Sequence, residues 1–237
     1  MEKLQGKTAL ITGGNKGIGL GVAEAMLQQG MKVAITGRDT EDLADAKAKL
    51  EKIGEVKTFQ VDVTDLAGQE TVVNEIVSDW GSLDVVIANA GVGYFAPIDE
   101  LSAEQWNATI DTNLTGVFNT VKASLEPIKK AQGYIITIAS LAGTNFFASG
   151  AAYNASKFGL VGFTQAIMLD LRQYGVKVTT IMPGSVSTYF NNHTPSEADA
   201  WKIQPEDIGQ MVMDLLHMHP RTLPSKVEVR PTTPPSK

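Results

Sequence analysis

The sequence predicts an α/β protein built on one doubly wound, mostly parallel sheet with helices on both faces. Short apolar runs alternate along the chain with longer segments in which apolar residues recur at helical spacing. The short runs are almost continuously apolar, which is typical of strands buried on both faces of a parallel sheet. The 237 residues contain no linker and no repeat of solenoid length, so we expect a single domain over residues 1–237.

The expected elements alternate from the amino terminus onward. The runs expected to form strands are residues 7–12, 32–36, 56–61, 84–88, 134–139, 176–182 and, last, 226–230. The segments expected to form helices are residues 17–29, 39–53, 66–80, 103–128, 150–174 and 205–217. Asp39 or Thr40 suits the N-cap of the second helix, because either side chain accepts a hydrogen bond from a free backbone N–H. Residues 231–237 hold three prolines, and we expect a flexible tail there.

Composition and charge exclude several classes of protein. The chain has no cysteine, which rules out a disulfide scaffold, a thiolate nucleophile and cysteine-based zinc sites. Its formal charge of -6 argues against nucleic acid as the main partner, since phosphate binding needs clustered lysine and arginine. No run reaches the roughly 18 apolar residues of a membrane span, and the first residues do not form a signal peptide. We therefore expect a cytoplasmic protein with no membrane partner.

A glycine-rich turn follows the first expected strand and precedes a helix. Gly13, Gly17 and Gly19 give the spacing G-x-x-x-G-x-G, and the residues between them include Asn15, Lys16 and Ile18. Glycine lets the backbone approach a pyrophosphate, and the start of the helix supplies free N–H groups and the positive end of its dipole. The order of strand, turn and helix therefore predicts a dinucleotide site.

The end of the second expected strand bears on the choice of dinucleotide. An acidic residue here would bind the ribose diol of NAD, whereas an arginine suits the 2′-phosphate of NADP. Thr36 and Gly37 are not acidic, and Arg38 follows them. Lys16 adds a second cation that could reach the same phosphate. We expect NADP(H), with the alternative that Arg38 is only a solvated loop residue.

A tyrosine and a lysine with the spacing of one helical turn suggest proton-transfer chemistry. Tyr153 and Lys157 share one face of an expected helix, and Ser140 ends the preceding strand, at the edge where ligands bind in parallel sheets. A free tyrosine has a pKa of about 10, and a nearby ammonium lowers that pKa. Tyr153 is then expected to act as general acid and base, while Ser140 holds a carbonyl oxygen. Taken singly, Ser140 could instead be a helix cap and Tyr153 a core residue.

These motifs together resemble the short-chain dehydrogenase/reductase family over about residues 7 to 188. The matching elements are residues 12–19, Asn89-Ala90-Gly91, Asn113, Ser140, residues 153–157 and Pro183-Gly184. The resemblance implies a single-domain Rossmann fold in which Lys157 binds the nicotinamide ribose and Asn113 anchors a water that leads protons to Lys157. It also implies contacts to the cofactor from Asp62, Val63, Asn89, Ala90, Gly91, Pro183, Gly184, Val186 and Thr188.

The function that the resemblance implies is NADPH-dependent reduction of a ketone or aldehyde to an alcohol. Carbonyl reductases and 3-oxoacyl-[acyl-carrier-protein] reductases are the most similar subgroups, although the chain lacks the Asp-Gly-Gly that usually follows the last strand of the second group. A non-catalytic NADP sensor and, less well supported, a methyltransferase remain as alternatives. The three histidines lack ligand spacing, so we expect no catalytic metal.

Substrate and assembly are indicated only by apolar patterning. The aromatic residues expected to line an apolar substrate pocket, or else to belong to the ordinary core, are Tyr94, Phe95, Phe146, Phe147, Tyr189, Phe190 and Trp201. Residues 184–204 are polar and irregular and are expected to form a lid. The segment 150–174 is apolar around most of its circumference. We expect a homodimer or homotetramer formed through residues 103–128 and 150–174, with cover by the chain itself as the alternative.

Overall fold

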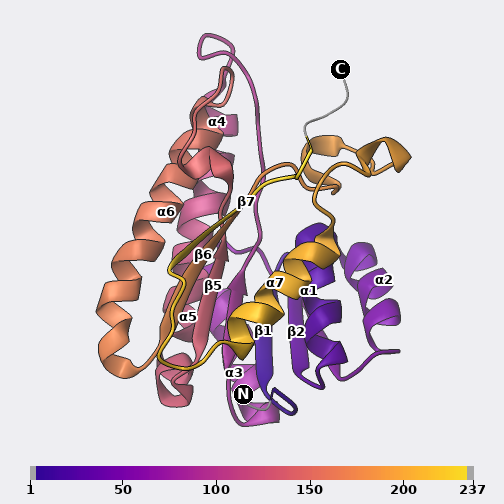
Figure 1. Ribbon diagram of the computed structural model, residues 1–237, viewed down its shortest axis with the longest axis vertical. Helices are drawn as coiled ribbons and strands as arrows, with labels where there is room; N and C mark the ends of the chain where they lie inside the picture. Colours follow the sequence, from indigo (N-terminus) through magenta and orange to yellow (C-terminus); the bar gives the residue numbers. More distant parts are fainter. Residues whose placement is uncertain (1–3, 234–237) are drawn as a thin grey trace.

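The computed structural model describes residues 4–233, and its centre is a seven-stranded parallel sheet (Figure 1). The strand order is β3-β2-β1-β4-β5-β6-β7. The strands are β1 (Thr8–Thr12), β2 (Lys32–Gly37), β3 (Val56–Gln60), β4 (Val85–Ala88), β5 (Tyr134–Ile138), β6 (Lys177–Pro183) and β7 (Lys226–Val229). The expected single-domain α/β fold is confirmed, and every pairing among the described strands is parallel rather than mostly so.

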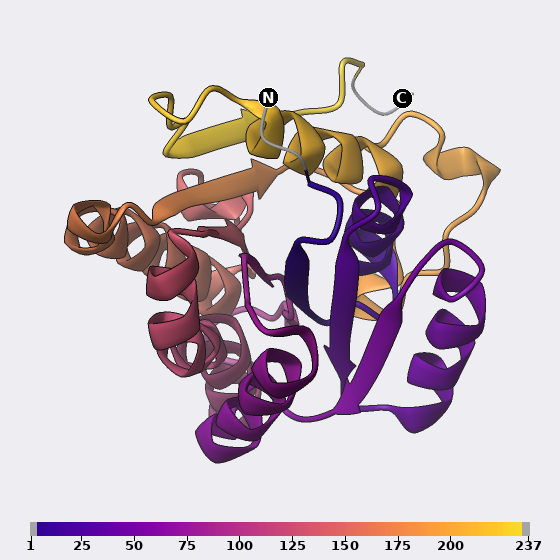
Figure 2. The ribbon, with the colours of Figure 1, turned by 90° about the horizontal axis from the view of Figure 1, so that it is seen from below.

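Helices cover the sheet in two layers, which Figure 2 shows from the end of the strands. On one face lie α1 (Gly17–Gln28), α2 (Thr40–Leu50) and α7 (Pro205–His217). On the other face lie α3 (Leu66–Trp80), α5 (Gly116–Ala131) and α6 (Ala151–Leu171). The helix expected over residues 103–128 is α4 (Ala103–Ile110), which continues through a π-helix (Asp111–Thr115) into α5. Asp39 caps α2, as expected, by accepting hydrogen bonds from two N–H groups of its first turn.

Strand periodicity divides the core between the two faces of the sheet. Ala9 and Ile11 of β1 pack among α1, α2 and α7, while Leu10 between them packs among α3, α5 and α6. All three side chains are fully buried, as the continuous apolar runs indicate. The part of the tail at residues 231–233 forms neither strand nor helix, and residues 234–237 lie outside the described residues.

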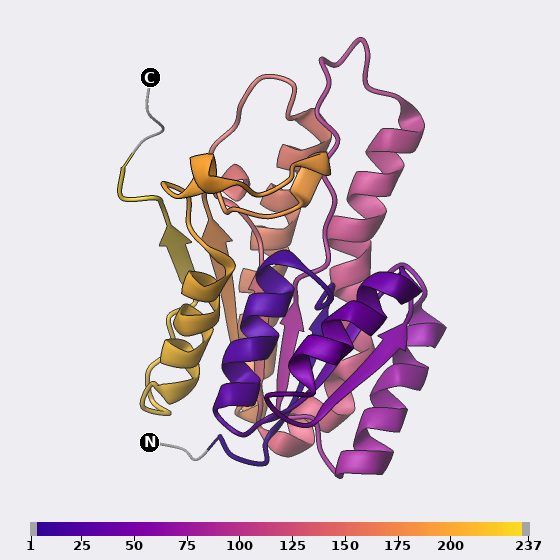
Figure 3. The ribbon, with the colours of Figure 1, turned by 90° about the vertical axis from the view of Figure 1, so that its right-hand side faces the viewer.

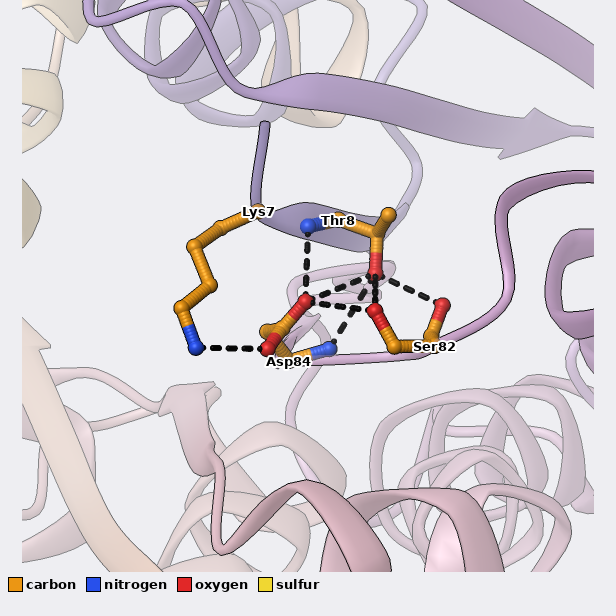
Figure 4. Close-up of polar contacts among 4 residues, drawn as sticks. All are labelled: Lys7, Thr8, Ser82 and Asp84. Carbon is orange, nitrogen blue, oxygen red and sulfur yellow. Dashed lines mark hydrogen bonds and ion pairs between the residues drawn. The ribbon is translucent and has the colours of Figure 1, made fainter. Parts of the chain in front are cut away.

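A polar cluster joins β1 to β4 at the amino edge of the sheet (Figure 4). The Asp84 carboxylate accepts hydrogen bonds from the Thr8 N–H at 3.0 Å, from the Ser82 hydroxyl at 2.9 Å and from the Lys7 ammonium at 2.9 Å. Burial alone would raise the pKa of this carboxyl, but these donors hold it below its ordinary value. The cluster fixes the amino ends of both strands and leaves their carboxyl ends free for loops.

The described helices include none that is both long and apolar enough to cross a membrane. One face of α6 nevertheless stays in solvent although it is apolar. Its exposed positions are Ala155, Phe158, Gly162, Ala166 and Leu169. No described part of the chain covers this face, and the expected interface between copies of the chain stays a prediction.

Candidate active site

The glycine-rich turn lies between β1 and α1 and has the backbone that its sequence requires. Gly13 and Gly17 have φ of 64° and 56°, in the left-handed region that favours glycine. A Cβ at position 19 would lie 2.3 Å from the Gly13 carbonyl oxygen, so a larger residue cannot pack there. Lys16, the N-cap of α1, makes no side-chain capping bond to the first turn. An open turn with no side-chain acceptor at the helix start fits a pyrophosphate.

The loop after β4 forms the opposite wall of this turn. The Asn89 side-chain amide donates to the carbonyl oxygens of Thr12, at 2.9 Å, and Gly13, at 3.1 Å. The backbone N–H groups of Asn89 and Ala90 both donate to the Thr12 hydroxyl. The sequence analysis counts Thr12 in the matching motif but gives its hydroxyl no role; the signal for that role is a hydroxyl at the end of an apolar strand, immediately before the turn.

The segment after β6 closes over the same turn. The position of a Cβ on Gly17 would be 3.2 Å from the Thr188 methyl carbon, so Thr188 packs directly on the glycine turn. Pro183 is the last residue of β6, and the Gly184 N–H donates to the Val229 carbonyl of β7 at 2.8 Å. Val186 forms a bridge with Ile203. Thr188 thus lies beside the glycine turn, and Pro183, Gly184 and Val186 belong to the segment that leads to it from β6.

Gly37 ends β2 and Arg38 follows it, at the place where the adenosine part of a dinucleotide is expected. A Cβ at Gly37 would lie 3.0 Å from the Asn15 side-chain oxygen, so the space beside this strand end is already narrow. The Arg38 side chain is 66% exposed, and its guanidinium lies 3.9 Å from the Asp62 carboxylate. The Lys16 ammonium lies 3.0 Å from the carboxylate of Asp42. Both cations expected at the 2′-phosphate are thus on the surface, each beside a carboxylate.

A cavity of about 580 Å³ lies next to Arg38 and Asp62, between the end of β3 and α3. Val63 does not line it. Its side chain packs inward against Gly116, the first residue of α5, and its carbonyl accepts hydrogen bonds from Gln69 and Asn119. Asp62 and Val63 are both expected to contact the cofactor, and only Asp62 faces this cavity.

Ser140, Tyr153 and Lys157 come together at the carboxyl edge of the sheet. Ser140 follows β5, caps a short 3₁₀ turn through its bond from the Ala142 N–H, and also forms a hydrogen bond with the Tyr153 phenol. Lys157 lies one turn further along α6, with its ammonium 5.7 Å from the centre of the Tyr153 ring. The ammonium donates to the Ile138 carbonyl at 3.1 Å. Ser140 is thus both a cap and a member of the group.

The ionisation of this group differs from the sequence-based expectation. Burial raises the pKa of the Tyr153 phenol, and the bond with Ser140 acts in the opposite direction. Burial also lowers the pKa of Lys157 to about 8. The pKa of the Tyr153 phenol is therefore raised by burial rather than lowered by Lys157 as expected. The physical reason is that the ammonium is itself removed from water and is directed to the Ile138 carbonyl.

Asn113 is fully buried within the π-helix between α4 and α5. Its side-chain oxygen accepts from the Val92 N–H at 2.8 Å, and its amide donates to the Val92 carbonyl at 2.8 Å and the Ser156 hydroxyl at 3.0 Å. A Cβ at Gly91 would lie 3.2 Å from that oxygen and 3.7 Å from the Lys157 ammonium. The side-chain oxygen of Asn113 and the ammonium of Lys157 therefore both lie close to Gly91. Ser156, between Tyr153 and Lys157 in the motif, was not singled out by sequence reasoning.

Comparison with known proteins gives one family. A family model described as short chain dehydrogenase matches residues 7–199. D-beta-hydroxybutyrate dehydrogenase of Cupriavidus necator is 39% identical over 189 residues, which cover 78% of this chain and 72% of the relative.

Solved structures match over almost the whole chain. An alcohol dehydrogenase from the archaeon Thermococcus sibiricus, complexed with 5-hydroxy-NADP, superposes with a TM-score of 0.90 at 28% identity and covers 98% of this chain and 99% of its own. Carveol dehydrogenase from Mycobacterium avium, in complex with NAD, superposes with a TM-score of 0.88 at 25% identity and covers 97% of this chain and 98% of its own.

Proposed function

Because the chain belongs to the short-chain dehydrogenase/reductase family, we propose that it is an NADPH-dependent oxidoreductase that reduces a ketone or aldehyde to the alcohol. The observation that carries the proposal is the grouping of Ser140, Tyr153 and Lys157 at the carboxyl edge of the sheet, next to the Asn89–Gly91 segment that packs on the glycine turn. A nucleotide sensor of the same fold has no use for a phenol with a bonded hydroxyl and an ammonium beside it. The enzyme is therefore preferred over that alternative.

Residues of the glycine turn would hold the pyrophosphate of a nicotinamide dinucleotide, which when bound would supply the hydride. NADPH is preferred over NADH because Gly37 leaves no acidic group at the end of β2 and Arg38 and Lys16 stand near it. Their present carboxylate partners are exposed, and such surface pairs contribute at most about 1 kcal/mol each. A doubly charged phosphate can replace them. The similar solved structures hold an NADP-type cofactor in one case and NAD in another, so they do not decide between the two. The proposed preference for NADPH therefore rests on Gly37, Arg38 and Lys16.

The proton is supplied by the chain itself. Tyr153, with its pKa raised by burial, stays protonated at neutral pH, which is the form that a general acid for carbonyl reduction needs. Ser140 donates a hydrogen bond to the same carbonyl oxygen and holds it in line with the phenol. Lys157, with a pKa of about 8, exchanges protons readily near neutral pH and restores the phenol proton from the side of Asn113. The protonated phenol is the form that reduction uses, and the phenolate is the form that oxidation uses.

The test follows NADPH and NADH absorbance with a panel of ketones, aldehydes, diketones and 3-oxoacyl thioesters. Tyr153→Phe should fold and bind NADPH but lose nearly all turnover. Tyr134→Phe is the matched control, because it removes a phenol that bonds to Thr179 within the sheet. Turnover retained by Tyr153→Phe would remove that residue from the mechanism. No turnover with any carbonyl in the wild-type protein would refute the enzyme assignment.

We also propose that α5 and α6 join copies of the chain into a homodimer or homotetramer. The exposed face of α6 is apolar along its length, and Phe118 of α5 is 46% exposed beside it, in edge contact with Phe163. An uncovered apolar strip of this kind marks an interaction surface. Sedimentation velocity should show dissociation in Phe158→Asp, whereas Ile98→Asp, at an exposed apolar residue of a loop, should stay associated. An unchanged oligomer in Phe158→Asp would place the interface elsewhere.

A further inference from the structure

Three phenylalanines from three separate loops form one cluster of rings with Tyr153, in which Phe95 and Phe190 contact the Tyr153 ring and Phe147 contacts Phe95. Phe95 follows β4, Phe147 follows β5 and Phe190 follows β6. The Phe95 ring centre lies 5.4 Å from that of Tyr153, 5.8 Å from that of Phe147 and 6.3 Å from that of Phe190. The Phe190 and Tyr153 ring centres are 5.7 Å apart. These spacings are those of direct ring packing. Figure 3 shows the three loops gathered at the same end of the sheet.

The backbone around these rings holds them in place. A Cβ at Gly93 would lie 2.5 Å from the Phe190 ring and 3.0 Å from the Phe95 ring, so both rings rest against bare backbone. The Asn154 side chain accepts from the Phe147 N–H at 3.3 Å and donates to the Asn145 carbonyl at 2.8 Å. Contacts within the chain therefore hold the three rings in place.

The three phenylalanine side chains are also partly exposed to solvent. Phe95, Phe147 and Phe190 are 38%, 47% and 37% exposed, although they pack on one another. Apolar surface that is fixed beside a general acid and left in water gains free energy when an apolar ligand covers it. The other aromatic residues expected at a pocket make no ring contact with this cluster among the described residues. They are Tyr94, Phe146, Tyr189 and Trp201.

The charges around the wall are negative or already paired. Residues 139–150 carry no charged side chain, and residues 89–102 carry only Asp99 and Glu100. In residues 184–204 the only basic side chains are His193 and Lys202, and each lies 2.5 Å from the Asp199 carboxylate. The ammonium of Lys157 is buried beneath the phenol. A carboxylate on the substrate would therefore find no unpaired cation in these three segments to offset the loss of its hydration.

We propose that Phe95, Phe147 and Phe190 form the wall that selects neutral, apolar ketones and rejects substrates with a carboxylate. The inference rests on the proposed function and deepens it. It separates this chain from its relative that is named for hydroxybutyrate, an anionic substrate, and it disfavours acidic carrier proteins. The apolar body of the ketone lies against the three rings while its carbonyl oxygen meets Tyr153 and Ser140.

The test compares matched neutral and anionic ketones with saturating NADPH. Ethyl acetoacetate against acetoacetate is one pair, and methyl 4-oxocyclohexanecarboxylate against its free acid is another. In the wild-type protein kcat/KM should favour the neutral member by about a hundredfold or more. Phe190→Ala should lower kcat/KM for the cyclic ester about tenfold, as expected for about one ring face of lost apolar contact. Phe190→Leu should retain most of the wild-type kcat/KM for the cyclic ester. Phe190→Arg should reduce the ratio of kcat/KM between the neutral and the anionic member of each pair.

The matched control is Phe146→Ala, which removes a ring that is 85% exposed next to Phe147 and should leave every ratio unchanged. NADPH fluorescence reports whether each variant still folds and binds cofactor. Equal or better reduction of the anionic members, or a Phe190→Ala variant that behaves as Phe146→Ala does, would overturn this inference while the enzyme assignment stands. Absence of turnover with both members of each pair and with the wider carbonyl panel would overturn the proposed function, and this inference with it.

Discussion

Replacing Lys157 with methionine should abolish turnover and at the same time stabilise the fold. The side chain is 4% exposed, and burial lowers its pKa from 10.5 to about 8. Each pKa unit corresponds to about 1.4 kcal/mol, so the buried ammonium opposes folding at pH 7 by about 3 kcal/mol. Methionine has a similar length and carries no charge. The lost hydrogen bond to the Ile138 carbonyl offsets about 1 kcal/mol of the gain.

The pH dependence gives the sharper test because its sign is fixed. A lysine whose folded pKa lies below its unfolded pKa destabilises the fold fully below about pH 8, and the effect disappears as pH rises towards 10.5. Urea unfolding of both proteins should therefore show the variant ahead by about 2 kcal/mol at pH 7, with the difference shrinking by pH 10. A variant less stable than wild type at pH 7, or a difference that does not change with pH, would refute the reasoning.

Two further predictions concern the turn and the opposite edge of the sheet. Gly19→Ala places a methyl group 2.3 Å from the Gly13 carbonyl oxygen, so the affinity for NADPH, measured by fluorescence, should fall at least tenfold. Gly162→Ala is the control, because that position has open space around it and the variant should bind NADPH normally. Asp84→Asn should lower the free energy of unfolding by about 1–3 kcal/mol at pH 7, because it removes the charge that donors of Lys7, Thr8 and Ser82 surround. Since the folded pKa of Asp84 is lowered, its contribution is present above about pH 4 and is lost as pH falls further, so urea midpoints of variant and wild type should converge in acid.

The fold was predictable because its periodicities are strong and local. The expected helices over residues 66–80 and 205–217 coincide with α3 and α7 to the residue, and every expected strand is present within a residue or two. The glycine turn was predictable for the same reason, since glycine at positions 13, 17 and 19 indicates a backbone that turns tightly or approaches another segment closely. Ser140 and the pair on α6 could be placed together because strand ends and a helix start meet at one edge of a parallel sheet.

The remaining features depend on contacts between segments that are distant in the sequence. No local pattern signals the π-helix that carries Asn113, because its amide is paired with Val92 and Ser156 across a loop and a helix. The ionisation of Tyr153 depends on how much of the chain covers it, so spacing alone overstated the influence of Lys157. The ring wall was equally hidden. Seven aromatic residues had the same sequence signal, and only packing separates three of them.

Arg38 tests whether the cofactor preference comes from the end of β2. A charge-assisted bond to phosphate contributes about 1.5–3 kcal/mol, and the two-thirds exposure of this side chain places Arg38 in the lower half of that range. Arg38→Leu should therefore weaken NADPH binding about tenfold to thirtyfold at low salt, with less effect at high salt, and leave NADH binding almost unchanged. Arg172→Leu, at the far end of α6, controls for the loss of net charge. Equal losses for the two cofactors would mean that Arg38 acts on the fold of the cleft, and no loss for NADPH would assign the 2′-phosphate to other residues.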